Sequence, residues 1–537
     1  MSGIRSFFRR GRGNGDAPRP ASGPAVATSI PVAPVAAEAV VATRQGAVRG
    51  RLSEGVFAFK GIPYAAPPFG VNRFRPPQPA DTWDGVRDAL EYGPTAPKPP
   101  YPPPFDKILP EPVIPGDDCL NLNIWTPELG AAKLPVMVWI HGGSYRNGTG
   151  AIPTYDGAHF ARDGVVCVTI NYRLGVDGFL ALDDGVANLG LLDQIAALRW
   201  VQENIAAFGG DPSQVTIFGE SAGGMSVSTL LAMPAAAGLF TRAIAQSGAA
   251  HYALPMATAK RVGGYLAEYL GVEPTREAIA AVPVERMAEA QMAMRLEQTT
   301  QPNPAKWGQT QATGMLFQPV IDGETLDALP IQRIAGGSSA NVDLLLGSNS
   351  DEFSFFIVPP GVIDMVTDEY LAAVATGYGL PVEQALAPYR SAHPEATPGE
   401  LLGAVTTDWL FRIPAVRMAE ARASAPAATY MYEFAWRSPQ FNGRLGACHA
   451  LEIAFVFDNL AQPENEPLAG SAPPQSLADA MHAAWVAFAR SGNPATSALP
   501  DWTRYDLSRR ATMRFDVASS LVEDPAAGER ALWEGIR

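Results

Sequence analysis

The most informative stretch of this chain is Val215-Thr216-Ile217-Phe218-Gly219-Glu220-Ser221-Ala222-Gly223-Gly224. Its first residues predict a short apolar strand, and a helix is expected to begin at Ala222. A serine at such a sharp strand-to-helix turn has a strained backbone and exposes its hydroxyl above the sheet. Gly219 and Gly223 flank Ser221 because side chains at these positions would collide with the neighbouring strand and helix. The pattern therefore predicts a nucleophilic serine, with the Ala222 N–H at the helix N-terminus as a donor to an oxyanion.

The composition limits the classes of protein to which the chain can belong. Its 537 residues are 47% hydrophobic and 18% charged, which is enough for one large enzyme domain or several smaller ones. The net charge of -14 argues against nucleic acid and against an anionic membrane surface as partners. Cys119, Cys167 and Cys448 lie far apart, so no disulfide framework or zinc site is predicted. We expect reduced thiols in a cytoplasmic protein, with no metal and no cofactor.

Residues 1–38 differ from the rest of the chain. They are rich in Gly, Pro, Ala and Ser, and most of their charged residues are arginines. Because nothing in this segment is periodic enough to fold, we expect a disordered tail before a single catalytic domain over residues 39–537. Prolines interrupt the apolar part and argue against a signal peptide, while the paired Arg9-Arg10 leaves an export signal as the alternative. No later stretch approaches the roughly 18 to 20 uninterrupted apolar residues of a transmembrane helix.

Short apolar segments alternate with helical patterns in the middle of the chain. Residues 120–125 alternate apolar and polar side chains, as a half-buried strand does. Three continuous apolar runs predict strands that are covered on both faces: residues 136–140, 165–170 and 215–218. The helical spacing of residues 191–205 falls between the last two runs, so an open, mostly parallel α/β sheet is predicted. Ligands of such sheets bind at the carboxyl ends of the strands, where the glycine-rich turns lie.

Later segments extend this prediction. Further strands are expected at residues 343–347 and 429–436, the second being the last clear strand. The prolines of residues 60–77 argue against helix and central strand. We expect the proline-rich loop 94–116 and the helical part 258–310 to shape the pocket.

A serine hydroxyl needs a base at neutral pH, and the base needs an acid to orient it. In this fold class the order along the chain is serine, acid, histidine, each on a loop after a strand. Of the six histidines, His449 fits that order best. Asp351 and Glu352, which follow the strand at 343–347, both qualify as the acid. The turn His141-Gly142-Gly143 directly follows a strand and supplies further N–H donors for an oxyanion hole.

From about Val40 to near its C-terminus, the chain resembles the type B carboxylesterase family, which includes cholinesterases and bacterial para-nitrobenzyl esterases. The motifs that carry the resemblance are Phe59-Lys60-Gly61-Ile62-Pro63-Tyr64-Ala65, Asp117-Asp118-Cys119-Leu120-Asn121-Leu122-Asn123, His141-Gly142-Gly143, Asn171-Tyr172-Arg173, Asn188-Leu189-Gly190-Leu191-Leu192-Asp193-Gln194, Phe208-Gly209-Gly210-Asp211-Pro212 and Gly219-Glu220-Ser221-Ala222-Gly223-Gly224. The resemblance implies an α/β-hydrolase fold, a mostly parallel central sheet flanked by helices, with helical insertions that shape an active-site gorge.

The same resemblance implies roles for individual residues. It selects Glu352 as the acid and agrees with Ser221 and His449 as nucleophile and base. The implied oxyanion donors are the backbone N–H groups of Gly143, Ser144 and Ala222. Residues implied around the triad are Glu220, Ser247 and Glu452, and the implied pocket residues are Phe355 and Phe356. Glu220 either favours the protonated base by its negative potential or bonds the elbow backbone. The chain departs from the usual glycine at Phe353 and Ala450 and from glycine or alanine at Ser144.

Together these patterns predict a serine hydrolase of carboxylic esters that works through an acyl-enzyme intermediate on a small-molecule ester. With a histidine base of ordinary pKa, activity should rise between about pH 5.5 and 7.5. An amidase, carbamate hydrolase or lactonase with the same triad is the alternative within enzymes. A catalytically silent adhesion or binding protein is the alternative from another class. The sequence leaves the physiological substrate, the acyl and alcohol preference and the oligomeric state open.

Overall fold

The computed structural model describes residues 37–537. The predicted tail of residues 1–38 lies outside this range apart from its last two residues, which begin strand β1 (Ala37–Ala42). The export signal considered at Arg9-Arg10 also lies outside it. Among residues 37–537, no helix combines the length and the apolar character that crossing a membrane requires.

A sheet of 13 strands forms the centre of the described residues. In spatial order its strands are β1, β2 (Ala47–Ser53), β3 (Val56–Pro63), β5 (Asn121–Thr126), β7 (Val166–Ile170), β6 (Leu134–Ile140), β8 (Gly210–Glu220), β9 (Arg242–Gln246), β12 (Asp343–Asn349), β13 (Thr429–Phe434), β14 (Ala511–Phe515) and β15 (Ser520–Glu523), with β4 (Val86–Asp88) beside β2. Neighbours from β7 to β14 pair in parallel. Antiparallel pairs flank this centre, from β1 to β7 and at β14 to β15. The predicted mostly parallel α/β sheet is confirmed.

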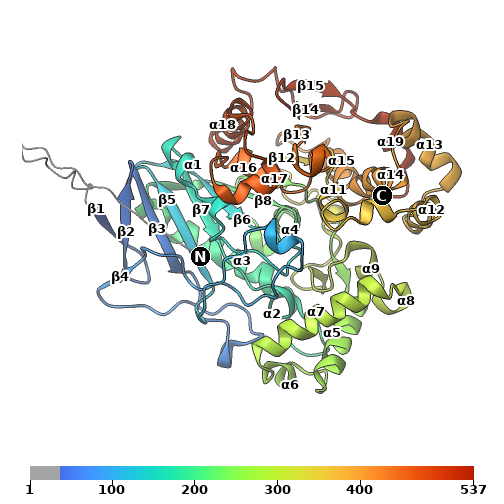
Figure 1. Ribbon diagram of the computed structural model, residues 1–537. Helices are drawn as coiled ribbons and strands as arrows, with labels where there is room; N and C mark the ends of the chain where they lie inside the picture. The colour runs from blue at the N-terminus through green and yellow to red at the C-terminus, as the bar shows by residue number, and fades with distance from the viewer. Residues whose placement is uncertain (1–36) are drawn as a thin grey trace, which may run out of the picture. The chain divides into compact units, whose positions relative to one another are not determined.

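Helices cover both faces of the sheet (Figure 1). They are α1 (Ala158–Arg162), α2 (Gly175–Phe179), α3 (Leu189–Asn204), α4 (Ala222–Leu230), α5 (Met256–Leu270), α6 (Arg276–Ala280), α7 (Val284–Thr300), α8 (Pro304–Trp307), α9 (Thr310–Thr313), α10 (Pro330–Ala335), α11 (Ser354–Ile357), α12 (Asp368–Gly377), α13 (Val382–Ala392), α14 (Pro398–Thr407), α15 (Ile413–Ala421), α16 (Ile453–Val456), α17 (Glu466–Ala469), α18 (Gln475–Ser491) and α19 (Ala527–Leu532). A short parallel pair, β10 (Leu254–Pro255) and β11 (Val320–Ile321), lies outside the main sheet.

Strand β6 shows how its sequence builds the two cores. Val136, Val138 and Ile140 belong to one buried cluster, together with residues of α3, α4 and α15. Met137 and Trp139 point the other way, into a second cluster with residues of α1, α16 and α18. Since successive side chains of a strand alternate between faces, a continuous apolar run must be covered on both sides. The run at residues 136–140 therefore predicts this position correctly.

Three strand predictions were wrong in part. Strand β5 is buried along its whole length, because its polar side chains find partners inside: Asn123 Nδ2 donates to Thr169 Oγ1 at 2.9 Å. Strand β3 continues to Pro63 through an irregularity between Phe59 and Ile62, and this irregularity lets the proline be included. The segment 429–436 is not the last strand, since the short strands β14 and β15 follow it.

Candidate active site

Ser221 occupies a sharp turn between the end of β8 and the start of α4. Its backbone has φ 56° and ψ −124°, a conformation that L-residues rarely adopt and that costs about 1–3 kcal/mol. The Ser221 N–H donates to Gln246 O at 2.9 Å, and the Ser221 carbonyl accepts from the Met225 N–H at 2.8 Å. These bonds to β9 and α4 hold the strained turn in place.

The glycines on either side of Ser221 pack against the end of β6. A Cβ atom at Gly223 would lie 2.0 Å from the carbonyl oxygen of Ile140, and one at Gly219 would lie 2.5 Å from the same oxygen. Backbone atoms cannot give way as a flexible side chain could, so neither position accepts a larger residue. The predicted reason for these two glycines is confirmed.

The turn after β6 lies directly against Ser221. A Cβ at Gly142 would approach Ser221 Cβ to 3.1 Å. The Gly143 carbonyl accepts from the backbone N–H groups of Arg146 and Asn147 at 3.0 and 2.9 Å, which closes the turn. Among the described residues, the Gly143 and Ser144 N–H groups have no acceptor. Two unused donors therefore lie on a turn beside the serine, as an oxyanion hole requires.

A buried ion pair from the proline-rich loop fastens the far end of this turn. One carboxylate oxygen of Glu111 accepts from the Gly148 N–H at 3.1 Å, and the other accepts from Asn147 Nδ2 at 3.1 Å. Lys98 Nζ lies 3.6 Å from the same carboxylate, and its side chain is 1% exposed. Burial raises the pKa of Glu111, while Lys98 and the two hydrogen bonds oppose that shift.

His449 and Glu352 meet on loops that follow β13 and β12. His449 Nδ1 and Glu352 Oε2 are 2.6 Å apart, and Glu352 Oε1 accepts from the Asn349 N–H at 2.8 Å. Glu352 is fully buried. The adjacent Asp351 faces elsewhere: it pairs with Arg437 at 3.0 Å and accepts from the Ala447 N–H at 2.9 Å. Of the two adjacent carboxylates, Glu352 contacts the imidazole and Asp351 fastens the loop that carries it.

The second imidazole nitrogen contacts Glu220. His449 Nε2 lies 3.1 Å from Glu220 Oε1, and both side chains are buried. Ser221 and His449 line the same cleft, but no hydrogen bond joins Ser221 Oγ to His449 in this structure. Only the resemblance implied a role for Glu220 at the base; residue patterns alone do not predict this carboxylate–imidazole contact, because it depends on how the ends of β8 and β13 lie in the folded sheet.

Three buried carboxylates surround one imidazole, and they change its protonation. Burial alone would lower the pKa of His449, but the charges of Glu220 and Glu352 and the hydrogen bond that His449 donates to Glu352 outweigh it and raise the pKa to about 9. Burial, together with the charges of Glu452 and Glu352, holds the pKa of Glu220 well above its ordinary value. Both partners of the Glu220–His449 contact therefore retain protons more strongly than in water, and together they hold a proton near neutral pH.

The remaining predicted residues lie around this centre. Glu452 accepts from Gln246 Nε2 at 3.1 Å and from Asn349 Nδ2 at 2.7 Å. Burial, then the charge of Glu352, raises the pKa of Glu452 to about 7. Ser247 is buried, and its hydroxyl has no partner among the described residues.

Aromatic rings enclose the imidazole. The ring centres of Phe355 and Phe356 lie 6.2 and 5.3 Å from that of His449. Phe411, from the π-helical turn Asp408–Arg412, lies closer at 4.8 Å. Sequence patterns do not single out Phe411, which lies in a segment of ordinary helical periodicity.

The cleft over Ser221 has a volume of about 850 Å³, including its open mouth. Its walls are mainly apolar and aromatic: Tyr101, Ile108, Leu109, Pro110, Ile152, Tyr155, Phe355, Phe356, Ile453 and Leu468. The loop 94–116 thus contributes to the pocket as expected. Residues 258–310 contribute no side chain to this wall among the described residues, so the expectation is not met for the cleft directly over Ser221. The nearer helical pieces are α11 and α16, which follow the acid and the base.

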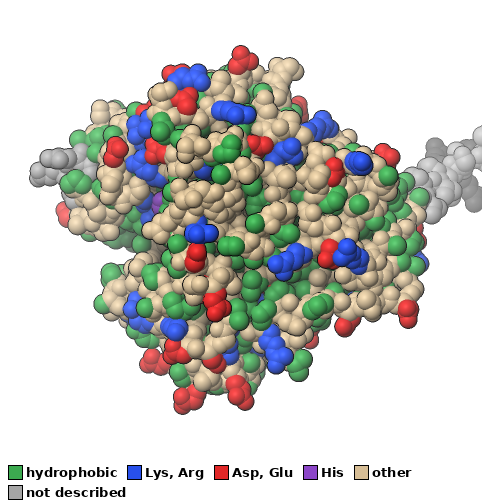
Figure 2. Space-filling model, turned by 180° about the vertical axis from the view of Figure 1, so that it is seen from behind, with side chains coloured by type: hydrophobic (Ala, Val, Ile, Leu, Met, Phe, Trp, Pro, Cys, Tyr) green, Lys and Arg blue, Asp and Glu red, His purple; other side chains and the backbone are tan. Residues whose placement is uncertain are grey.

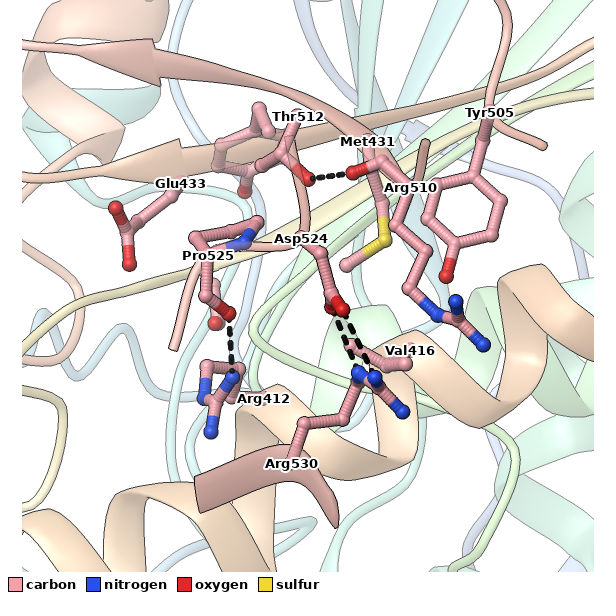
Figure 3. Close-up of a pocket in the computed structure, with 12 residues that line it drawn as sticks. Arg412, Val416, Met431, Glu433, Tyr505, Arg510, Thr512, Asp524, Pro525 and Arg530 are labelled. Carbon is pink, nitrogen blue, oxygen red and sulfur yellow. Dashed lines mark hydrogen bonds and ion pairs between the residues drawn. The ribbon is translucent and has the colours of Figure 1, made fainter. Parts of the chain in front are cut away.

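A second, smaller hollow lies beside β13 and β14 (Figure 3). Arg530 pairs with Asp524 at 2.7 Å, and Arg412 binds Asp408 and the Pro525 carbonyl. Arg510 pairs with Glu420 at 3.1 Å. Since each guanidinium has its own carboxylate, these contacts tie the C-terminal segment to α15 and its preceding turn.

Comparison with known proteins gives a consistent result. A family model described as "Carboxylesterase family" matches residues 37–533. The para-nitrobenzyl esterase of Bacillus subtilis (strain 168) is 39% identical over 504 residues, which cover 91% of this chain and 97% of that protein. Carboxylesterase 1D of Mus musculus is 34% identical over 540 residues, covering 93% of each chain. The crystal structure of a Geobacillus stearothermophilus carboxylesterase superposes with a TM-score of 0.81 at 39% identity, over 92% of this chain and 99% of that one.

Proposed function

The chain belongs to the carboxylesterase family and hydrolyses carboxylic esters, and we propose that Ser221, His449 and Glu352 carry out this hydrolysis. Ser221 Oγ attacks the ester carbonyl and forms a tetrahedral intermediate. His449 Nε2 takes the serine proton and gives it to the leaving alcohol, and an acyl-enzyme remains. Water then attacks the acyl-enzyme with the same base, and the acid product leaves. Glu352 holds the imidazole through Nδ1 and stabilises the imidazolium.

The N–H groups of Gly143, Ser144 and Ala222 bind the oxyanion in this proposal. Such donors gain strength in the transition state because they are fixed before charge develops. Two observations support the assignment: the Gly143 and Ser144 donors have no acceptor among the described residues, and α4 begins at Ala222. The Glu111 carboxylate keeps the turn in place from the side away from the substrate.

The observation that carries the proposal is the 2.6 Å contact between His449 and Glu352 in the same cleft as the strained Ser221 turn. In the reacting complex Nε2 must exchange its contact with Glu220 for one with Ser221 Oγ. Contacts of this kind are often long in enzymes without substrate and shorten when substrate binds. Glu220 then remains beside the imidazole and favours its protonated form.

Hydrolysis of para-nitrophenyl esters, from acetate to decanoate, tests the proposal. We expect turnover by the wild type and a loss of about a thousandfold or more in kcat for Ser221→Ala. A fluorophosphonate probe should label the wild type at Ser221 and leave the variant unlabelled. Wild-type activity in the variant would show that another residue is the nucleophile. If the wild type neither hydrolyses these esters nor reacts with the probe, the result would favour the alternative of a catalytically silent binding protein.

We also propose a cytoplasmic location. Cys119, Cys167 and Cys448 are all free thiols and buried, which fits a reducing compartment. Fractionation of producing cells tests this proposal, and recovery of the protein from the periplasm or the medium would contradict it.

A further inference from the structure

Arg146 and Arg295 are half-buried arginines without an acidic partner. Arg146 lies in the turn after β6, and its Nε donates to Asn147 Oδ1 at 2.8 Å. Arg295 lies on α7, and its Nη1 donates to Gln298 Oε1 at 2.6 Å. Among the side chains that the structure describes, no carboxylate forms an ion pair with either guanidinium, and each guanidinium donates to a single protein oxygen.

Other arginines without an ion pair, such as Arg242 and Arg422, donate to backbone carbonyls, whereas the guanidiniums of Arg146 and Arg295 each bind a single side-chain oxygen. The chain has 54 acidic residues against 40 lysines and arginines, and the face seen in Figure 2 carries side chains of both signs. The arginines of the hollow beside β13, by contrast, all have carboxylates, as Figure 3 shows for Arg530. Half-buried guanidiniums that keep free donors are available to bind an anion.

Packing contacts bring the two arginines to the same place. The carbonyl of Tyr145, next to Arg146, accepts from the Gly175 N–H at 2.6 Å. A Cβ at Gly175 would lie 2.1 Å from Gln291 Oε1 on α7. Arg295 follows Gln291 by about one helical turn and therefore lies on the same face of α7. The turn that carries Arg146 and the face that carries Arg295 thus meet across Gly175.

This place adjoins the catalytic cleft. The Arg146 N–H donates to the carbonyl of Gly143 at 3.0 Å, and Gly143 and Ser144 line the cleft. Glu111 is the acid of this neighbourhood, but it is already held by Lys98 and by the Gly148 and Asn147 donors. Lys98 and Arg146 therefore lie near this one carboxylate, and Arg295 lies beside Arg146. Burial and then the charge of Arg146 lower the pKa of Arg295 to about 10, which agrees with two neighbouring cations.

We propose that Arg146 and Arg295 form an anion subsite at the edge of the cleft, which binds a carboxylate carried by the ester substrate. The subsite rests on the proposed function, because its ligand is part of the molecule that Ser221 attacks. A guanidinium offers parallel N–H donors that match the two oxygens of a carboxylate. A phosphate offers similar oxygens, so the test must separate the two anions.

Matched ester pairs test the subsite. For the acyl side, kcat/KM for 4-nitrophenyl hydrogen glutarate is compared with that for 4-nitrophenyl pentanoate. For the alcohol side, 4-acetoxybenzoate is compared with 4-methylphenyl acetate. In at least one pair, Arg295→Met should reduce the preference for the anionic ester by about tenfold or more, which equals 1.4 kcal/mol. Raising the salt concentration should reduce the wild-type preference in the same pair.

Arg286→Met is the matched control, because Arg286 lies on the same helix and has only a loose contact with Glu289 at 4.0 Å. It removes the same charge at a distance from the cleft and should leave the preference in place. An equal loss of preference in both variants, or no loss with Arg295→Met in either pair, would overturn the proposal. Turnover of the neutral esters reports separately on the proposed function.

If the wild type hydrolyses none of these esters, calorimetry tests the subsite directly with glutarate and with inorganic phosphate. We expect glutarate to bind the wild type and to bind Arg295→Met at least about tenfold more weakly. Absence of glutarate binding would refute the subsite. Tighter binding of phosphate than of glutarate would refute the carboxylate as its ligand.

Discussion

Replacing Glu220 by glutamine should move the pH dependence of hydrolysis to lower pH. The variant keeps the size of the side chain and removes the negative charge that lies 3.1 Å from His449 Nε2. Hydrolysis needs the neutral imidazole, so activity rises as pH increases through the pKa of His449. Because the neighbouring carboxylates raise that pKa, the wild-type rise should lie above the range of about pH 5.5 to 7.5 expected for an ordinary histidine. Loss of one carboxylate lowers the pKa of His449, and the rise then shifts toward acid.

The size of the shift follows from the distance and the burial of the pair. Two unit charges about 4 Å apart at an effective dielectric constant of about 20 interact by about 4 kcal/mol, or about three pKa units. Two effects reduce this value: the raised pKa of Glu220 keeps part of that carboxylate neutral, and the glutamine oxygen can still accept from Nε2. We therefore expect a shift of about one to three units.

The assay is kcat/KM for a neutral short-chain ester between pH 5 and 10, with the wild type and Glu220→Gln. Glu464→Gln is the matched control, since Glu464 lines the same cleft without contacting His449. It should leave the position of the rise unchanged. If kcat/KM of Glu220→Gln rises at the same pH as in the wild type, or at a higher pH, the electrostatic role is refuted and Glu220 is a structural carboxylate.

Three further outcomes are expected. Gly223→Ala should lower the free energy of unfolding by about 1–3 kcal/mol or more, because the new Cβ would lie 2.0 Å from the carbonyl oxygen of Ile140. Gly264→Ala is the control: this position lies in the middle of α5 with open space around it, so the melting temperature should rise slightly. Glu452, whose pKa is raised to about 7, binds a proton in the folded state that the unfolded chain releases above pH 4.5. The wild-type free energy of unfolding should therefore fall between those pH values by up to about 3 kcal/mol relative to Glu452→Gln, as urea titrations at pH 5 and 8 can measure. Glu111→Ala removes two hydrogen bonds to the oxyanion turn and should reduce kcat for a neutral ester by about tenfold or more with a smaller effect on KM.

The parts of the fold that the sequence predicts well are those with a local physical cause. The run into Ser221 is apolar and the next residues are small, so a strand, a turn and a helix follow from neighbouring positions alone. The same reasoning wrongly predicted that β5 is half-buried, because the polar Asn123 side chain finds its partner, Thr169, on another strand. Strand β14 is only five residues long and pairs with β13, from which it is separated by about 80 positions of mostly helical and loop structure.

The residues of the active site also fall into those that local sequence predicts and those that it does not. His449 could be selected by its order after the serine and the acid, and neither position nor residue type separated Asp351 from Glu352 before the resemblance was used. In the structure the two differ completely, since one lies beside Arg437 and the other beside the imidazole. The Phe411 ring has no sequence signal, and the Glu220 contact was implied only by the resemblance, because both depend on how distant segments lie in the folded sheet.

The anion subsite shows why a net charge predicts so little about one place on a protein. The charge of -14 gives a sound argument against nucleic acid as a partner, because such a ligand spans a large surface. A carboxylate on a small ester spans only a few ångströms, and charges beyond about 8 Å are largely screened at physiological salt. The substrate carboxylate would therefore be attracted by the nearby cations Arg146, Arg295 and Lys98, which outnumber the single nearby acid, Glu111. A substrate that the whole chain should repel can thus be favoured at the cleft, and the salt dependence of the matched ester pairs measures that difference.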